Sequence, residues 1–365
     1  KPSFVDSFAT DEFAGCETAE QSLFKSIIDK RLPLSGRMKR QQQVFLFGDD
    51  GDEIASSVMV PLHGQGWGGI LSIGSFDGLH LGHQSILNQV ISLSDRLKLP
   101  SIVASFDPHP REVLSQDYPH LLSPGSEKTA LLESFSIDAF GLIPFTKMMS
   151  FVEPEEFVEH VLVKHMLTKA VVVGYDHRFG RNRRGDFDML CRLGKQFDFE
   201  VHECEAVSDA DLPISSSRIR TLLQQGTVDE AAHQLGRRYS IGGEIIRGAG
   251  RGRTLGVPTA NLIPDHERKL VPLSGVYAVK VDVPHLKGRF DGMMNIGTRP
   301  TFDGKSGIHL EVHLFDFDDD LYDRELRVEF HERVRDEQRF SFKEALIAQL
   351  KLDSERCRRS LSGIS

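Results

Sequence analysis

Apolar and polar residues follow two different patterns along this chain, and each pattern predicts its own kind of domain. Between about 70 and 205, short apolar runs alternate with segments whose apolar residues recur at helical spacing. This alternation is typical of a doubly wound parallel α/β sheet, which binds ligands beyond the carboxyl ends of its strands. The strands are predicted at 70–73, 101–106, 139–143, 170–173 and 199–207, and the helices at 83–97, 127–135, 155–167 and 187–197.

From about Gly236 onward the segments are short, β-rich and separated by Gly, Pro and Asp turns. Such spacing predicts an all-β domain, most simply a small barrel. A capping-box pattern from Ser341 to Glu344 then predicts the start of a C-terminal helix packed on the barrel. The barrel strands are predicted at 239–247, 276–283, 290–296, 308–315 and 326–331.

The length of 365 residues suits two or three domains. We expect an N-terminal extension of unknown role at 1–65, an α/β domain at 66–225 and a β-barrel domain at 226–365. Within the extension, 44–67 is predicted to be an irregular lead-in, with glycines and acidic residues at 48–53.

The loop after the first strand, at 74–83, carries the most informative chemistry. Gly74 and Gly78 allow a tight turn between a strand and a helix, a layout that aims backbone N–H groups and a helix N-terminus at one spot. His80 and His83 lie three residues apart, so both imidazoles can face a phosphate there. The alternatives are half of a metal site, for which no third ligand has zinc-type spacing, and two ordinary surface histidines.

Two further loops, 107–111 and 174–185, also follow predicted strands. The second carries Arg178, Arg181, Arg183 and Arg184, and it is either a phosphate clamp or a solvated basic loop. Downstream, a hydroxyl-rich helix start at 215–217 with Arg220 one turn later is a weaker candidate for a second anion site.

In the β-rich half, a glycine-rich loop at 248–256 precedes Thr259 and Asn261, whose side-chain oxygens suit a hard cation such as Mg²⁺. This loop lacks the G-K-[ST] ending of a Walker A motif, and a surface turn is the alternative. Within 308–315, apolar residues alternate with His309, Glu311 and His313. If this polar face lines a pocket instead of facing solvent, Glu311 is placed to take a proton from a hydroxyl.

A net charge of −9 and a pI near 5.9 argue against nucleic acid as the main partner. The four cysteines are scattered without a C-x-x-C pair, which predicts reduced thiols and a cytoplasmic protein. No apolar run approaches membrane-spanning length, so we expect no membrane contact. We expect a monomer or a weak homo-oligomer.

From about 70 to 360, the chain resembles the bifunctional riboflavin kinase/FAD synthetases of bacteria. The resemblance rests on seven blocks in the family's order, at 74–83 (GSFDGLHLGH), 105–114 (SFDPHPREVL), 174–181 (GYDHRFGR), 215–220 (SSSRIR), 252–262 (GRTLGVPTANL), 295–302 (NIGTRPTF) and 310–317 (LEVHLFDF). It implies a nucleotidyltransferase domain followed by a riboflavin kinase barrel. Riboflavin and ATP would give FMN, and FMN with a second ATP would give FAD and pyrophosphate, both steps using Mg²⁺.

The resemblance also implies roles for individual residues. His80 and His83 would bind ATP phosphates and stabilise the departing pyrophosphate, and Glu311 would be the general base for the ribityl hydroxyl. The other residues implied to bind ATP or FMN in adenylyl transfer are Gly74, Phe76, Asp77, His109, Gly174, Asp176, Arg178, Ser215, Ser216 and Arg220. Those implied in the kinase are Gly248, Gly250, Gly252, Thr254, Pro258, Thr259 and Asn261 for ATP, with Thr259 and Asn261 also holding Mg²⁺, and Asn295, Gly297, Thr298 and Arg299 in a flap over the flavin.

Two features depart from the family's pattern. His177 stands where an aromatic residue is common, and the N-terminal extension has no counterpart. The rival functions are a monofunctional enzyme, with one domain kept as a scaffold, and a non-catalytic flavin sensor that binds the same small molecules.

Overall fold

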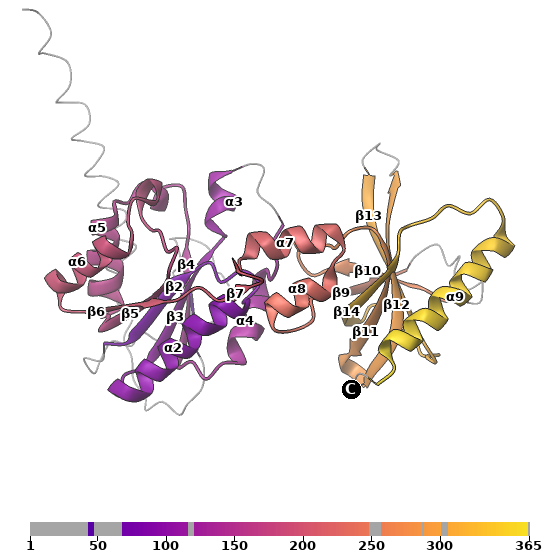
Figure 1. Cartoon of the computed structure of the whole chain (residues 1–365), viewed down its shortest axis with the longest axis horizontal. Coiled ribbons are helices and arrows are strands. Elements are labelled where there is room, and N and C mark those ends of the chain that lie inside the picture. Colours follow the sequence, from indigo (N-terminus) through magenta and orange to yellow (C-terminus); the bar gives the residue numbers. More distant parts are fainter. Residues whose placement is uncertain are drawn as a thin grey trace, which may run out of the picture. The chain divides into compact units, whose positions relative to one another are not determined.

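The computed structural model describes residues 43–46, 68–115, 120–247, 257–286, 288–300 and 306–363 (Figure 1). These residues form two compact units. The first comprises 43–46, 68–76, 83–115 and 130–206, and the second comprises 77–82, 120–129 and 207–363. Two short segments that interrupt the first unit in sequence, 77–82 and 120–129, therefore belong to the second.

The first unit is built on a six-stranded parallel sheet in the order β1-β4-β3-β2-β5-β6. The chain adds β3 and β4 on one side of β2, then places β5 and β6 on its other side. The strand order therefore reverses between β2 and β5, as expected of a doubly wound sheet. The strands are β1 (Gln43–Leu46), β2 (Ile70–Gly74), β3 (Ser101–Asp107), β4 (Ala139–Pro144), β5 (Ala170–Gly174) and β6 (Glu200–Cys204).

Helices cover both faces of this sheet because successive residues of its central strands are buried on opposite sides. Ile70 packs with Val90 and Leu93 of α2 (Leu81–Leu97) on one face. Leu71 belongs to the core of the other face, together with residues of η2 (Phe157–His165) and α6 (Phe187–Phe197). The remaining helical segments of this unit are α3 (Pro110–Leu114), η1 (Met149–Phe151), α5 (Pro154–Glu156) and η3 (Arg181–Arg183). The helix α4 (Gly125–Glu133) begins in the second unit and ends in the first.

The first unit corrects one prediction and refines another. β1 forms where an irregular lead-in was expected, because a four-residue strand offers too little alternation to be recognised. The helix expected at 155–167 is present, but over Phe157–His165 it winds as a π-helix, which the spacing of apolar residues does not distinguish from an α-helix.

The second unit contains a closed antiparallel barrel in the order β10-β13-β12-β11-β14-β9. Its interior is filled by large side chains, among them Tyr277 and Phe330, whose ring centroids lie 5.3 Å apart. The strands are β9 (Ser240–Ile246), β10 (Ala260–Pro264), β11 (Gly275–Val283), β12 (Gly288–Pro300), β13 (Ser306–Leu314) and β14 (Glu325–Arg335), with η5 (Pro284–Leu286) between β11 and β12. The predicted barrel is confirmed, but β10 was not among the predicted strands.

The helix α9 (Lys343–Leu361) lies against the outside of the barrel (Figure 1). Its Cys357 and Leu361 pack with Val276, Met293 and other buried residues of the barrel's outer surface. The predicted capping box is wrong, since Phe342 is the N-cap residue and makes no side-chain capping bond. The unit also contains the hairpin β7 (Ser208–Asp209) and β8 (Leu212–Pro213), and the helices α7 (Ser216–Gln225) and α8 (Val228–Leu235).

Within the described ranges, no helix combines the length and the apolar character needed to span a membrane.

Two Arg–Asp pairs that join α9 to the barrel region offer a matched test of burial. Asp353 is only 2% exposed and accepts hydrogen bonds from Arg335 Nε at 3.0 Å and Nη2 at 2.7 Å. Because its removal leaves a largely buried guanidinium unpaired, we expect Asp353→Ala to lower the free energy of unfolding by about 3–5 kcal/mol. Urea unfolding followed by circular dichroism measures this change.

The control is Asp316→Ala, which removes the partner of Arg358. Both side chains of that pair are exposed and screened by water, so its loss should lower the free energy of unfolding far less than the loss of Asp353 does. Equal effects of the two substitutions would contradict the assignment of Arg335–Asp353 as the buried connection.

Candidate functional site

In the first unit, the three predicted loops leave the carboxyl ends of three adjacent strands, β3, β2 and β5. Gly74 ends β2, Asp107 ends β3 and Gly174 ends β5. After β2, the rings of Phe76 and His83 meet edge to face with their centroids 5.3 Å apart. The edge at which the strand order reverses therefore gathers the loops that carry His83, His109 and Asp176, and ligands of doubly wound sheets bind at this kind of edge.

Gly174 explains how closely the end of β5 approaches α2. A Cβ atom there would lie 3.3 Å from Ile86 Cδ1, tighter than ordinary packing, and 3.7 Å from Asp176 Oδ1. The glycine leaves this corner of the edge open, with Asp176 exposed beside it.

The arginines of the 174–185 loop form ion pairs with neighbouring carboxylates. Arg178 Nη1 lies 2.9 Å from Asp186 Oδ2, while Arg181 and Arg184 both donate to Glu153 at 3.2 and 3.1 Å. Because all three guanidinium groups are substantially exposed, the pairs hold the loop in place without strong stabilisation. A phosphate at this loop would compete with Glu153 or Asp186.

Two histidines at this edge have defined environments. His109 Nδ1 accepts a hydrogen bond from Arg111 N at 3.2 Å and caps the short helix α3, so its Nε2 carries the proton in the neutral form. His177 stacks on Phe179, with ring centroids 5.8 Å apart. Burial lowers the pKa of His177 to about 4, so this departure from the family's aromatic residue adds an uncharged ring at neutral pH.

In the second unit, the segment 77–82 carries His80 on a buried anchor. The Asp77 carboxylate is inaccessible and accepts hydrogen bonds from Leu122 N, Ser123 N and Arg220 Nη2 at 3.0, 2.9 and 2.5 Å. Ser216 Oγ donates to the Asp77 carbonyl oxygen at 2.9 Å. Ser215 Oγ accepts from Arg218 N at 3.3 Å and caps α7.

These contacts bear on two residues expected near the nucleotide. The carboxylate of Asp77 faces protein donors, and the guanidinium of Arg220 donates to Asp77 and, through Nε, to the His120 carbonyl oxygen at 2.9 Å. Their geometry favours positioning of the loop over direct contact with ATP.

His80 itself is 6% exposed. Burial lowers its pKa from 6.5 to about 4, and the charges of Arg237 and Arg220 act in the same direction while Asp77 opposes them. The ring is therefore neutral at pH 7 and offers one N–H donor. An arriving polyphosphate would favour the imidazolium, because an adjacent negative charge stabilises the protonated form.

On the barrel, cross-strand register places three polar predicted residues in one row. Asn261 of β10 is opposite Glu311 of β13, and Glu311 is in turn opposite Asn295 of β12. Leu310 and Val312, on either side of Glu311, point into the barrel core, so the row lies on the outer surface. Side chains of directly opposite residues have Cβ atoms roughly 5 Å apart, so the two amides flank the carboxylate.

Two further residues lie near this row: His313, which the alternation already placed on its face, and Glu337, which the sequence analysis did not identify. The Nδ1–H of His313 donates to the Pro258 carbonyl oxygen at 2.7 Å, which ties β13 to the residue preceding Thr259. A Cβ atom on Gly297 would lie 2.8 Å from Glu337 Oε1 and 3.3 Å from Asn295 Nδ2. Glu337 therefore borders the row, although it follows β14 in a stretch without any periodic pattern.

Some predicted residues lie outside the described residues or are described only by their backbone. The 248–256 loop, with Gly248, Gly250, Gly252 and Thr254, is not described. Thr298 and Arg299 lie in β12, without a description of their side chains. Among the residues that are described, no group of three or more His, Cys, Asp or Glu side chains is arranged to hold a metal, so His80 and His83 find no third ligand of these types there.

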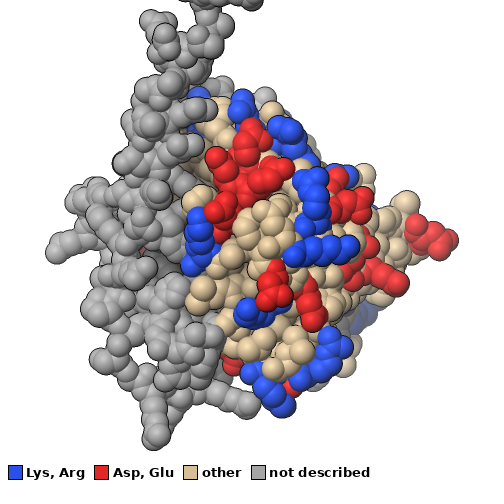
Figure 2. Space-filling model, turned by 90° about the vertical axis from the view of Figure 1, so that its left-hand side faces the viewer, with Lys and Arg blue, Asp and Glu red and all other residues tan. Residues whose placement is uncertain are grey.

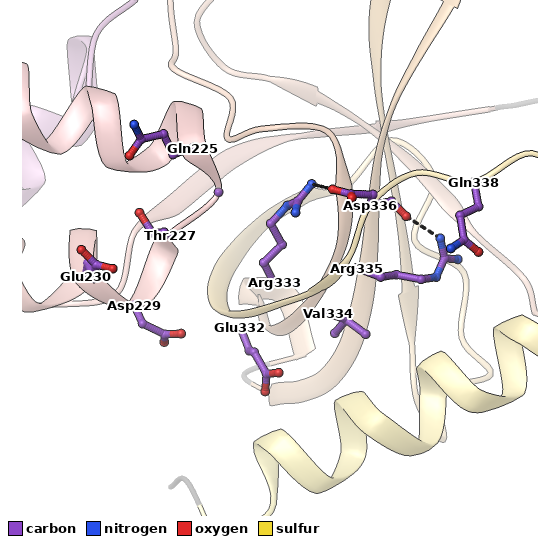
Figure 3. A pocket seen from close by; sticks show the side chains of 11 residues that line it. Gln225, Thr227, Asp229, Glu230, Glu332, Arg333, Val334, Arg335, Asp336 and Gln338 are labelled. Atoms are coloured by element: carbon purple, nitrogen blue, oxygen red, sulfur yellow. Dashed lines mark hydrogen bonds and ion pairs between the residues drawn. The ribbon is translucent and has the colours of Figure 1, made fainter.

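A surface cavity of about 540 Å³ lies elsewhere in the second unit, between the α7–α8 turn and the end of β14 (Figure 3). Arg333 and Asp336 point toward each other at its side, with Nη2 and Oδ1 2.7 Å apart. None of the predicted site residues lines this cavity. Figure 2 shows another face of the molecule, where the described Lys and Arg side chains alternate with Asp and Glu instead of forming one basic surface.

Comparisons with known proteins match the two halves of the chain separately. The family model for FAD synthetase matches residues 66–218, and the one for riboflavin kinase matches 235–361. A bifunctional riboflavin kinase/FMN adenylyltransferase from Pseudomonas fluorescens is 38% identical over 78% of this chain and 91% of its own length. One from Haemophilus influenzae is 37% identical over 78% of this chain and 92% of its own.

A solved structure is also similar over most of the chain. It is the crystal structure of a protein described as a macrolide-efflux protein from Streptococcus pneumoniae, with 31% identity and a TM-score of 0.74. The match covers 81% of this chain and 95% of that one.

The environment of His80 predicts its titration. Its pKa is about 4 in the folded protein and 6.5 when unfolded, so the unfolded chain binds the proton first as the pH falls. The stability contributed by the neutral ring is complete above pH 6.5 and is lost between pH 6.5 and 4, by about 3 kcal/mol. An NMR titration should show the His80 ring protons unchanged down to about pH 5, and a midpoint near 6.5 would contradict the burial described here.

Proposed function

This chain belongs to the family of bifunctional riboflavin kinase/FMN adenylyltransferases, and we propose that its two reactions use separate sets of the residues described above. The enzyme phosphorylates riboflavin to FMN with ATP, then transfers AMP from a second ATP to FMN, giving FAD and pyrophosphate. The row formed by Asn261, Glu311 and Asn295 is the observation that best supports the assignment of the kinase site.

At the kinase site, Glu311 is the general base. Its half-buried carboxylate on the outer barrel surface accepts the proton of the ribityl hydroxyl as the oxygen attacks the γ-phosphorus of ATP. Asn295 on the flavin side and Asn261 on the ATP side flank it. We assign the segment from Asn295 to Arg299 as a flap over the flavin. The glycine-rich 248–256 loop, with Pro258 beside it, would bind ATP.

The residues beside Glu311 fit Mg²⁺. Thr259 and Asn261 are half-buried and supply a hydroxyl and an amide oxygen, and Mg²⁺ is commonly held by a few protein oxygens together with substrate phosphates and water. When bound, the ion would neutralise charge on the transferred phosphoryl group.

At the adenylyltransferase site, the loops at the carboxyl edge of the parallel sheet bind ATP and FMN. His80 and His83 donate hydrogen bonds to the triphosphate and stabilise the charge that develops as pyrophosphate leaves. The FMN phosphate is the nucleophile, so no protein nucleophile is required. His109, Asp176 and Arg178 line the flavin and phosphate side of the site, with Ser215 and Ser216 near the triphosphate. Gly74, Phe76 and Gly174 also bind ATP or FMN.

We assign riboflavin phosphorylation to the domain at 226–365 and adenylyl transfer to FMN to the domain at 66–225. We also assign the enzyme to the cytoplasm, because its cysteines carry no pairing pattern. The alternative is a non-catalytic flavin sensor, which would bind riboflavin without consuming ATP. An assay of ATP consumption with riboflavin and Mg²⁺ distinguishes the two.

Substitution of the proposed base should separate the two reactions. Glu311→Gln keeps the shape of the side chain but removes its capacity to accept a proton, so we expect FMN formation to fall by at least about 100-fold. FAD formation from supplied FMN and ATP should stay within a factor of two. Chromatographic time courses with Mg²⁺ and either riboflavin or FMN measure both rates.

The controls are Glu325→Gln, an exposed carboxylate of β14, and the reciprocal double variant His80→Ala/His83→Ala. Glu325→Gln should change neither rate, whereas the double variant should lose FAD formation and keep FMN formation. Loss of both activities in Glu311→Gln or in the double histidine variant would argue against separate sites.

A further inference from the structure

The segment that carries His80 adopts a backbone conformation that needs outside support. Gly78 and Leu79 have φ angles of 82° and 41°, both in the left-handed region. For a leucine this conformation is strained, and such strain persists only where surrounding contacts hold it. Leu79 is also almost completely buried, so it cannot relax toward solvent.

Arg237 contacts this strained backbone directly. Its Nη2 donates to the Gly78 carbonyl oxygen at 2.8 Å, and its Nη1 lies 3.4 Å from the Leu79 carbonyl oxygen. These are the two carbonyl groups that immediately precede His80. A planar guanidinium with several fixed donors is suited to hold two successive carbonyl groups at once.

A second set of contacts supports the same segment through residues 121–123. The Asp77 carboxylate accepts from the Leu122 and Ser123 amides, and Gly78 N donates to Ser123 Oγ at 2.7 Å. On its other side, this strip pairs with 268–270, where Leu121 N donates to the Arg268 carbonyl oxygen at 2.7 Å and Leu270 N donates to the Leu121 carbonyl oxygen at 2.8 Å.

Lys269 is the charged centre of that second set. Its Nζ donates to the Leu122 carbonyl oxygen at 2.7 Å and to Glu127 at 2.5 Å, and it lies 4.4 Å from the centre of the Tyr239 ring. Burial lowers the pKa of Lys269, and the Glu127 carboxylate opposes that effect. If this ammonium group were removed, the Glu127 carboxylate and the Leu122 carbonyl oxygen would both lose the hydrogen bond that Lys269 donates to them.

We propose that Arg237 and Lys269 are positioning residues for adenylyl transfer, because they fix the backbone that presents His80. Both residues lie in 235–361, the part of the chain that matches the riboflavin kinase family, whereas His80 lies in 66–218, which matches FAD synthetase. The sequence that builds the kinase barrel therefore also sets the geometry of the other reaction. This inference rests on the proposed role of His80.

The test compares Arg237→Met with Arg238→Met in the full-length enzyme. Arg238 is the adjacent arginine and donates to Asp229 and to the His331 carbonyl oxygen, so it makes none of the contacts with 77–82 that Arg237 makes. Because misplacement of a catalytic group by about 1 Å costs up to about 100-fold, Arg237→Met should lower kcat for FAD formation from FMN by roughly 10- to 100-fold. KM for FMN should change by no more than about threefold.

Riboflavin phosphorylation by the same sample reports whether the barrel is intact, and it should stay within a factor of two. Arg237→Lys, which keeps the positive charge but has one donor nitrogen in place of the Nη1 and Nη2 pair, should recover part of the lost kcat. Arg238→Met should leave the ratio of the two activities unchanged. An equal fall of both activities in Arg237→Met, or an unchanged kcat for FAD formation, would overturn the proposal.

A second pair of variants tests Lys269 and provides an alternative if Arg237→Met does not fold. Lys269→Met should lower FAD formation selectively, whereas Lys280→Met, which removes another buried ammonium group from its pair with the more exposed Asp291, should leave the ratio of activities unchanged. Equal ratios in these two variants would overturn the role of Lys269. A wild-type enzyme that makes FMN but no FAD would overturn the proposed function itself, a failure visible before any substitution is made.

Discussion

The buried carboxylate of Asp77 is the constraint on which much of the second unit depends. It lies out of contact with water and has backbone amides and Arg220 around it, and a buried charge is tolerated only with such complete pairing. Satisfying it fixes three segments that are far apart in sequence: the 77–82 segment, the strip at 120–123 and the start of α7. The position of His80 follows from this arrangement.

The two reaction sites are positioned by different physical means. On the barrel, Asn261, Glu311 and Asn295 are aligned by the register of hydrogen-bonded strands, which specifies side-chain direction along its whole length. In the segment before α2, His80 depends on side chains that hold a strained backbone from outside. A site of the first kind tolerates surface changes, whereas one of the second kind is sensitive to substitutions distant in sequence, such as those at Arg237.

The sequence predicted what depends on local pattern. The alternation in 308–315 correctly placed Leu310, Val312 and Leu314 in the core and Glu311 on the opposite face, although Ile308 at the end of the barrel is exposed. The strand β10 was missed because its few residues follow a glycine-rich stretch. The hydrogen bonds from Arg237 to Gly78 and from Lys269 to Leu122 could not be predicted, since they join residues more than 140 positions apart and leave no periodic signal.

Native-state hydrogen exchange of the wild-type enzyme tests this account most directly. If the Asp77 anchor holds the segment before His80, the amides of Gly78, Leu122 and Ser123 open only with the surrounding core. They should then exchange as slowly as the amides of the barrel strand β11, whose residues share a core with Leu122. Exchange of these three amides at the rate of exposed loops, with β11 still protected, would show that the segment is not held and would contradict the account.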